Sequence, residues 1–206
     1  MEQKSHWETV YQQKGPGEVS WYQPHLNVSL TLLANAGLSA ESRILDVGGG
    51  ASTLVDDLLA RDVSDVTVLD ISAHALDAAK ARLGERAKRV TWIEADITRA
   101  QLPSASYNLW HDRAVFHFLT NAEDRRRYIA AMRDALTPGG HALLATFALH
   151  GPPRCSGLEV VRYSPDTLLH ALGQGFILNE AVYETHHTPF GTTQNFVYCR
   201  FQMTES

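Results

Sequence analysis

The chain has 206 residues, 44% of them hydrophobic and 20% charged, which is enough for one large domain but too few for two comfortable ones. Its net charge of −5 and the lack of a long Lys/Arg run argue against a nucleic acid partner. The basic triplet 125–127 stands beside Glu123 and Asp124, which is typical of a solvent-exposed helix face.

Cysteine usage and apolar run length indicate the cellular setting. The two cysteines, Cys155 and Cys199, make no disulfide framework, and the start of the chain does not resemble a signal peptide. The longest apolar stretch, around residues 142–149, is far short of the roughly 20 residues that span a bilayer. We therefore expect a cytoplasmic protein without a membrane partner, and a monomer by default.

The first 40 residues precede the first expected strand and are rich in aromatic side chains. Apolar spacing predicts helices over 5–14 and 26–36, separated by a break at 15–17. Trp7, Tyr11, Trp21 and Tyr22 all fall in this segment. They either pin a terminal helix to the body or belong to a lid over a ligand. We interpret 1–40 as an N-terminal helical lid and 41–206 as the domain that it covers.

From residue 42 onward, expected strands and helices alternate along the chain. The strands are expected at 43–47, 65–70, 89–94, 107–111 and 141–148, and the helices at 51–61, 73–84 and 122–136. This alternation predicts right-handed crossovers and a parallel sheet with helices on both faces. The remainder predicts a helix over 164–172 and two consecutive strands, 176–185 and 192–201. We expect an α/β fold: a doubly wound, mostly parallel, seven-stranded sheet with a C-terminal antiparallel hairpin.

The first expected strand ends in a glycine turn that predicts a cofactor site. Asp46 is followed by Gly48, Gly49 and Gly50, and a helical pattern begins directly afterwards. Glycines at such a turn let backbone amides approach a ligand closely. A dinucleotide fingerprint would place a third glycine where Thr53 stands. The acid before the turn suits a cation better than a pyrophosphate, which points to the sulfonium and amine of S-adenosylmethionine.

Two further acids stand at the carboxyl ends of the next two strands. Asp70 lies 20 residues after Gly50, the spacing at which an acid accepts from both ribose hydroxyls. Asp96, with Ile97 behind it, is placed to accept from an exocyclic amine while the isoleucine packs on the base. The alternative for each of these acids is that it caps its own loop.

Together these features resemble the class I S-adenosylmethionine-dependent methyltransferases. The match comprises 46–52, Asp70, Asp96-Ile97 and the turn 136–140, with Ser52 standing where a third glycine is usual. The resemblance implies S-adenosylmethionine as cofactor, S-adenosylhomocysteine as product, and a Rossmann-like methyltransferase fold. It implies a cofactor site formed by Trp7, Tyr11, Trp21, Asp46, Gly48, Gly49, Gly50, Asp70, Ile71, Asp96, Ile97 and His111.

Candidates for the acceptor end follow the fourth expected strand. We propose His111, Asp112, Arg113 and His117 as catalytic candidates, since residues just past this strand face the cofactor's methyl group in the family. The Asp112-Arg113 pair resembles that of thiol- and thiopurine-type methyltransferases. Arg113 then either binds a substrate carboxylate or forms an ion pair with Asp112 or Asp134. No metal is expected, because Cys155, His186 and His187 lack the spacing of a zinc site.

The predicted reaction is transfer of a methyl group to S, N or O of a small molecule by in-line displacement. A protein-lysine methyltransferase is the alternative, since some compact members share a Trp–Tyr–Trp leader like this one. Those enzymes usually carry Asp-x-Gly-Thr after the fourth strand, where this chain has 112–115, Asp-Arg-Ala-Val. A module that binds S-adenosylmethionine without turnover ranks lower, and a nicotinamide oxidoreductase lacks its glycine fingerprint.

Overall fold

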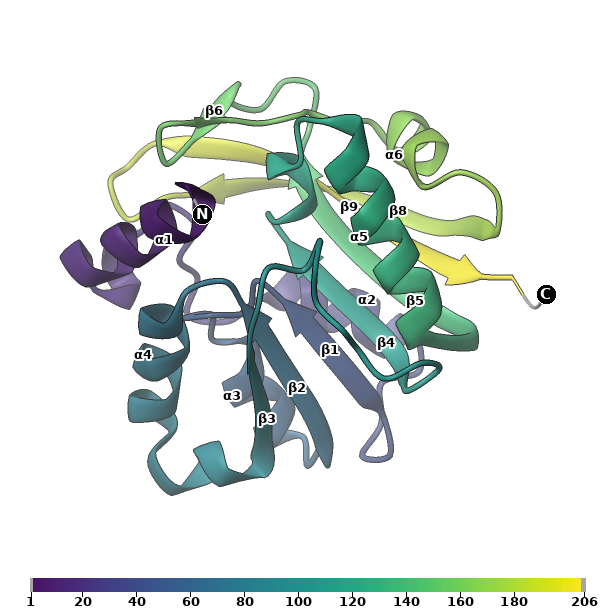
Figure 1. Cartoon of the computed structure of the whole chain (residues 1–206). Coiled ribbons are helices and arrows are strands. Elements are labelled where there is room, and N and C mark those ends of the chain that lie inside the picture. The colour runs from purple at the N-terminus through teal and green to yellow at the C-terminus, as the bar shows by residue number, and fades with distance from the viewer. Residues whose placement is uncertain (1, 205–206) are drawn as a thin grey trace.

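The computed structural model describes residues 2–204, so the outermost residues of the expected ranges 1–40 and 41–206 lie outside it. A seven-stranded sheet runs through the molecule in the order β3-β2-β1-β4-β5-β9-β8 (Figure 1). Its strands are β1 Arg43–Val47, β2 Asp65–Asp70, β3 Val90–Glu94, β4 Tyr107–Arg113, β5 Leu136–Phe147, β8 Phe176–His187 and β9 Thr193–Met203. The first five are parallel, whereas β9 is antiparallel to both β5 and β8. The expected doubly wound sheet with a closing hairpin is therefore confirmed.

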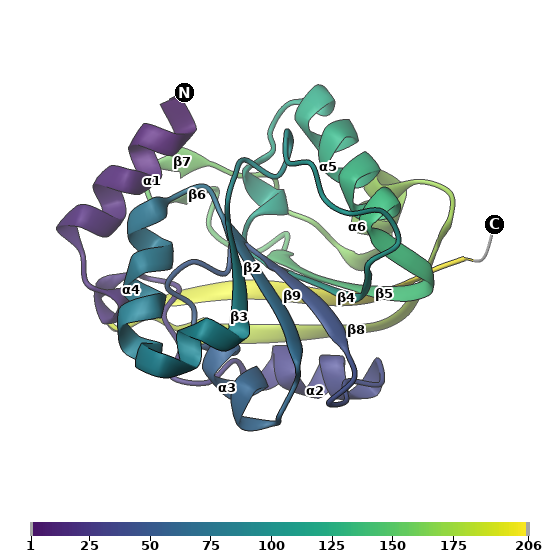
Figure 2. The same cartoon turned by 60° about the horizontal axis from the view of Figure 1, so that its bottom comes forward.

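Helices cover both faces of the sheet and bury one apolar core on each (Figure 2). One core joins the sheet to α2 (Asn27–Asn35), α3 (Leu54–Ala60) and α4 (Ala73–Leu83). The other joins it to α5 (Ala122–Ala135) and α6 (Pro165–Leu172). Alternate residues of β1 enter opposite cores, Ile44 the first and Leu45 the second. This burial on two faces is the reason why the parallel strands read as nearly continuous apolar runs.

Several boundaries differ from the sequence-based expectation. β4 extends to Arg113 instead of ending at 111, because its last residues pair with β5. α3 begins at Leu54, since a turn closes from the Ser52 amide to the Gly49 carbonyl. Between β5 and α6 lies a small hairpin that was not expected, β6 (Arg154–Cys155) and β7 (Leu158–Glu159). His186 and His187 belong to β8 and not to the loop that follows it.

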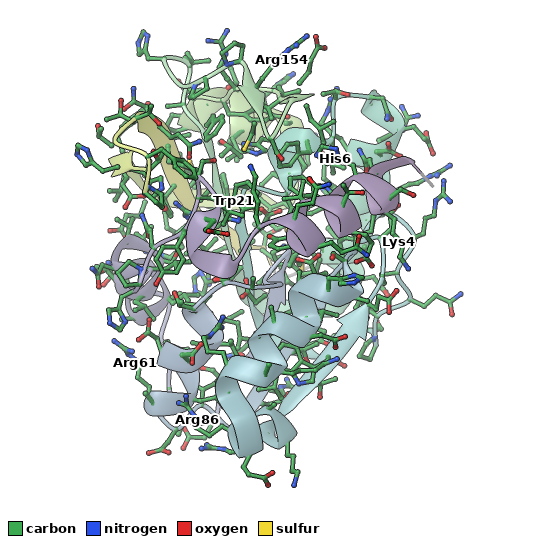
Figure 3. All side chains as sticks on the ribbon, turned by 90° about the vertical axis from the view of Figure 1, so that its left-hand side faces the viewer. Lys4, His6, Trp21, Arg61, Arg86 and Arg154 are labelled. Carbon is green, nitrogen blue, oxygen red and sulfur yellow. The ribbon has the colours of Figure 1, made fainter. Side chains whose placement is uncertain are left out.

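The N-terminal segment has two parts with different surroundings. α2 packs on the sheet through Leu30, Leu32 and Leu33 and belongs to the body of the domain. Before it, α1 (Glu2–Gln13) and the 3₁₀ turn η1 (Pro16–Glu18) cross the carboxyl ends of the strands (Figure 1). We call residues 2–23 the lid. Figure 3 views the side on which α1 runs across α4, with Trp21 beside it.

Among the described residues, no helix has the length and apolar character needed to cross a membrane.

Candidate active site

The glycine turn after β1 is shaped by the side chains that lie beneath and beside it. Gly48 has φ +68°, a conformation that L side chains rarely adopt, and its amide donates to the Leu69 carbonyl at 2.7 Å. A Cβ on Gly49 would overlap the Asp46 carboxylate, and one on Gly50 would overlap the Asp70 carboxylate. The glycines thus let two acids from neighbouring strands tuck against the turn.

Asp46 is buried and held on one side only. His111, its register partner on β4, contacts Asp46 Oδ1 through Nδ1 at 2.7 Å. The other ring nitrogen of His111 lies 2.9 Å from the Ser29 hydroxyl of α2. Asp46 Oδ2 is buried without a hydrogen-bond partner among the described atoms. A buried carboxylate oxygen without a donor is rare in folded proteins and marks this end of the turn as a candidate binding position.

Asp70 is also buried, and its environment changes its protonation. Burial raises the pKa of Asp70 to about 7, with Asp46 nearby adding to the rise. The backbone amide of Ser72 donates to Asp70 Oδ1 at 2.8 Å and opposes this shift. Without a ligand, the carboxyl therefore exchanges its proton near neutral pH.

A cavity with about 790 Å³ of empty space opens above these strand ends. Residues from β1, β2 and the segment after β3 line one part of it, and residues from the lid, β4 and β6 line the other. Its lining includes Gln3, Trp7, Tyr11, Trp21, Gly48, Asp70, Ile71, Asp96, Ile97, Arg113, Val115, Phe118, Leu119 and Cys155. Apolar and aromatic side chains with a few polar groups among them are the usual lining of a small-molecule site.

A second cavity of about 480 Å³ continues along the glycine turn. It shares Tyr11, Trp21, Val47, Gly48 and Arg113 with the first, so the two form one site. Its other lining residues come from the lid, the start of α2, β1, the turn and β4: Val19, Tyr22, Gln23, Leu26, Asp46, Gly49, Ala51, Ser52, Thr53 and His111. The two cavities together give a long pocket, with Asp96 toward one end and Asp46 at the other.

Aromatic rings from the lid and from the turn after β4 form one wall of this pocket. Trp7 lies at the centre of the group, with ring centroids 5.7 Å from Trp21, 6.5 Å from Tyr11 and 5.1 Å from Phe118. Phe118 belongs to the 3₁₀ turn η3 (Phe116–Phe118). Burial and the proximity of Asp70 raise the pKa of Tyr11 far above its ordinary value, so its hydroxyl stays protonated.

Arg113 is the cation of the site and lies where the two cavities meet. Its Nε donates to the Tyr198 hydroxyl at 2.9 Å, and its Nη1 donates to the Trp21 carbonyl at 2.8 Å. Its guanidinium lies over the Phe196 ring, 4.5 Å from the centroid. Nη2 is buried with no partner among the described atoms. Neither ion pair considered from the sequence, with Asp112 or with Asp134, is formed.

Two catalytic candidates from the sequence lie outside the pocket lining. Asp112 accepts hydrogen bonds from the Tyr128 hydroxyl at 2.6 Å and from the amides of Val115 and Phe116, so it fixes the turn after β4. Burial raises the pKa of Asp112 to about 6. His117 is fully buried between Phe118 and Phe147, and burial lowers its pKa to about 3. The contacts and burial of Asp112 and His117 favour structural roles for both.

The remaining expected residues are brought together at the carboxyl ends of the strands. Gly50 lies against the Asp70 carboxylate without lining either cavity. Asp96 both lines the pocket and accepts from the amide and hydroxyl of Thr98. Ser29, Phe118 and Tyr198 are in or beside the site but are not among the site residues expected from the sequence. Phe118 had a weak signal, since it follows Arg113 closely in sequence, whereas the other two contribute through contacts that only the tertiary fold creates.

This architecture is the Rossmann-like methyltransferase fold, and comparisons with known proteins agree. A family described as "Methyltransferase domain" matches residues 44–140. The eEF1A lysine and N-terminal methyltransferase of Bos taurus is 27% identical over 149 residues, which cover 69% of this chain and 21% of that protein. An uncharacterized methyltransferase of Mycobacterium bovis is 36% identical over 104 residues, half of each chain.

Among solved structures, the 1,6-didemethyltoxoflavin-N1-methyltransferase of Burkholderia thailandensis shares the fold with a TM-score of 0.77. It is 18% identical, and the match covers 98% of this chain and 88% of that one. This chain spans about a fifth to a half of the length of these curated relatives. The match of residues 44–140 to a methyltransferase domain and the shared fold confirm the resemblance to the class I S-adenosylmethionine-dependent methyltransferases that the sequence indicated.

The residues present fit S-adenosylmethionine as the cofactor of this family. The turn presents glycine backbone where side chains would block approach, and the buried Asp46 Oδ2 lacks a donor beside it. Asp70 lies one strand away for ribose hydroxyls, and Ile71, Asp96 and Ile97 line the end that would take the base. These groups follow the order of the strands, with Asp46 on β1, Asp70 on the neighbouring β2 and Asp96 after β3.

Proposed function

We propose that the protein transfers a methyl group from S-adenosylmethionine to a heteroatom of a small acceptor molecule. The cofactor supplies an electrophilic methyl group on a sulfonium that is already an excellent leaving group. The protein therefore has to align an acceptor with this methyl group and exclude water from the site. The lid supports this function, since Trp7, Tyr11 and Trp21 cover the pocket from the side opposite the strand ends.

The proposed cofactor contacts follow the order of the strands. Asp46, Gly48 and Gly49 would hold the amino acid part, with His111 behind Asp46. Asp70 would accept from the ribose hydroxyls, while Ile71, Asp96 and Ile97 would enclose the adenine. Gly50 would act by leaving room for the Asp70 carboxylate beneath the turn. Trp7, Tyr11 and Trp21 would close over the cofactor.

The contacts of Arg113 are the observation that supports the proposed class of acceptor molecule. Its guanidinium is fixed by Tyr198, by the Trp21 carbonyl and by Phe196, yet Nη2 lacks a partner. A partly buried cation with one free donor between aromatic walls suits an anionic or carbonyl-bearing acceptor. It opposes a protonated amine at the same position. A polar or anionic small molecule therefore fits this pocket better than a lysine ammonium.

The lining residues also bear on how the acceptor becomes a nucleophile. Within the described part of the chain, no histidine lines the first cavity, and both nitrogens of His111 in the second are engaged. Burial raises the pKa of the Cys155 thiol to about 12, and Tyr11 stays protonated, so neither is a base at neutral pH. Asp70 and Asp96 also line the first cavity, but we assign both carboxyl groups to the cofactor. We accordingly propose an acceptor whose nucleophilic atom is unprotonated in solution near pH 7 and is oriented, not activated, by Arg113.

A protein acceptor is the second candidate, favoured by the similarity to proteins named eEF1A lysine and N-terminal methyltransferases. The matched segment covers only 21% of those proteins, and the charge of Arg113 opposes a lysine ammonium. The guanidinium of Arg113 would repel an unprotonated amine less than an ammonium. The two candidate functions differ in whether a small molecule or a protein receives the methyl group.

A labelling experiment separates the two candidates. Purified protein and S-adenosylmethionine with a labelled methyl group are incubated with cell extract divided into protein and small-molecule fractions. We expect label in the small-molecule fraction and a loss of at least tenfold for Arg113→Met. The matched control is Arg154→Met, because Arg154 lies nearby on β6 but is exposed and pairs with the exposed Glu159. Label confined to protein would favour the second candidate, and equal labelling by Arg113→Met would remove Arg113 from the acceptor site.

A further inference from the structure

A buried chain of three polar side chains lies behind the amino acid end of the proposed cofactor site. Ser29 comes from α2, His111 from β4 and Asp46 from β1, and each is at most 1% exposed. The hydroxyl lies 2.9 Å from His111 Nε2, and His111 Nδ1 lies 2.7 Å from Asp46 Oδ1. Three elements far apart in the sequence therefore meet at one imidazole.

The chemistry of the three groups fixes the direction of the hydrogen bonds. An ionised carboxylate only accepts, so the proton between His111 and Asp46 belongs to Nδ1 of the ring. In a neutral imidazole the other nitrogen then has a lone pair, and the Ser29 hydroxyl donates to it. Ser29 selects the tautomer in which His111 donates to Asp46.

The same residue types occur in hydrolytic triads, but the surroundings exclude that role for Ser29. The hydroxyl is fully buried in α2 and lines neither cavity, so no substrate carbonyl has room to approach it. The unsatisfied hydrogen-bond acceptor of these three residues is at the Asp46 end. Asp46 Oδ2 lacks a partner among the described atoms, and Asp46 lines the second cavity. The hydrogen bonds therefore orient the Asp46 carboxylate and do not activate the Ser29 hydroxyl.

We propose that Ser29 and His111 are positioning residues that hold Asp46 with Oδ2 directed to the amino group of the cofactor. This inference rests on the proposed function, since it requires an S-adenosyl ligand in the pocket. Without the Ser29 hydroxyl, Nε2 of His111 is a buried acceptor with no donor. The ring is then free to take the other tautomer, which presents a lone pair to Asp46 Oδ1, or to bind a second proton and form an ion pair with Asp46. Both outcomes weaken the hold of Asp46 on an ammonium.

Two ligands separate a positioning role from a merely structural one. S-adenosylhomocysteine carries the amino group, whereas methylthioadenosine has the same base, ribose and sulfur without the amino acid. We expect Ser29→Ala to weaken S-adenosylhomocysteine binding in calorimetry by about tenfold, the cost of leaving a buried group unsatisfied. Methylthioadenosine affinity should stay within about twofold of the unmodified protein. Ser29→Thr, which keeps the hydroxyl, should restore at least half of the lost affinity.

A third variant tests whether Ser29 acts on Asp46 through His111. His111→Asn keeps a donor near the Nδ1 position but no longer reaches Ser29, so adding Ser29→Ala to it should change S-adenosylhomocysteine affinity by less than twofold. Equal losses for both ligands in Ser29→Ala, or unchanged affinity for both, would overturn the positioning role while leaving the cofactor assignment intact. If the unmodified protein bound neither ligand, the proposed function itself would fail and the inference with it.

Discussion

Glu8 of the lid directs its carboxylate at the first backbone amide of α4, with Oε1 accepting from the Ala73 amide at 2.8 Å. Its Oε2 accepts from the Ser72 hydroxyl at 3.0 Å and also contacts His74 Nδ1. A carboxylate at this position satisfies free amides of the helix and interacts favourably with its dipole. Ser72 also donates its backbone amide to Asp70. The residues that bind Glu8 of the lid therefore also hold the acid proposed to bind the ribose.

Removing this contact should loosen the lid. We expect Glu8→Gln to lower the free energy of unfolding by about 1 kcal/mol, as for the loss of a helix cap. Dissociation of S-adenosylhomocysteine, followed by stopped-flow fluorescence, should become several-fold faster. Asp77→Asn is the matched control, since Asp77 is an exposed acid of the same helix α4 that pairs with Lys80. Equal dissociation rates in both variants would show that Glu8 does not hold the lid closed.

The Glu8 effect has a defined pH dependence. Burial alone raises the pKa of Glu8, but hydrogen bonds from His74, Ala73 and Ser72 outweigh it and lower the pKa from 4.5 to about 2. A depressed folded-state pKa contributes stability above pH 4.5 that is lost as the pH falls toward 2. The difference in unfolding free energy between the unmodified protein and Glu8→Gln should therefore shrink from pH 7 to pH 3. A constant difference across this range in urea titrations would contradict the assignment.

Asp70 should make cofactor binding depend on pH in the neutral range. Burial raises its pKa from 3.8 to about 7, so between these pH values the folded protein binds a proton that the unfolded chain lacks. The resulting contribution to stability is lost as the pH rises from 3.8 to about 7. Ribose hydroxyls and a nearby ammonium favour the ionised form. Calorimetric affinity for S-adenosylhomocysteine should hence rise between pH 5.5 and 7.5, with proton release. Asp70→Asn should bind more weakly, by about 1–3 kcal/mol, and lose this rise; a persisting rise would assign it to another group.

Gly50→Ala tests the packing of the turn on Asp70. Its Cβ would overlap the carboxylate and lie 2.8 Å from the Ala75 Cβ. Overpacking of this kind costs about 1–3 kcal/mol of stability, and the displaced carboxylate should lower S-adenosylhomocysteine affinity at least tenfold. Gly17→Ala is the control, because nothing lies within 4 Å of its added Cβ. If Gly50→Ala bound the ligand normally, the Asp70 carboxylate would not be needed where the structure places it.

Tyr198→Phe tests the orientation of Arg113. The Tyr198 hydroxyl accepts from Arg113 Nε and donates to Glu184 at 2.6 Å, so its loss releases one anchor of the guanidinium. Labelling of the small-molecule fraction should fall at least fivefold, while S-adenosylhomocysteine affinity should change by less than about 1 kcal/mol. A loss of cofactor affinity with retained labelling would place Arg113 at the cofactor instead of the acceptor.

Much of this architecture is readable in the sequence because local patterns produce it. The glycine turn requires residues without Cβ over Asp46 and Asp70, and the strand ends bring Asp70 and Asp96 to one edge of the sheet. Alternating strands and helices then leave few topologies, and the antiparallel hairpin follows from two strands with a short link.

The rest depends on contacts between distant segments. Asp112 reads as a catalytic acid in sequence, but Tyr128 and two amides of the next turn bind it instead. Nothing local to Ser29 shows that α2 will place it against His111, and nothing local to Glu8 shows that it will meet α4. β4 extends to Arg113 because Arg113 pairs with Ala145 of β5, 32 positions further along the chain. Such partners are set by tertiary packing.

The most direct test of the account is a titration of the protein's tryptophan fluorescence. Trp7 and Trp21 line the cavity, whereas Trp110 is fully buried elsewhere in the core. The account predicts saturable quenching by S-adenosylhomocysteine, lost in Asp46→Ala, and no saturable response to nicotinamide dinucleotides. Saturable binding of a dinucleotide, with no response to S-adenosylhomocysteine, would contradict it.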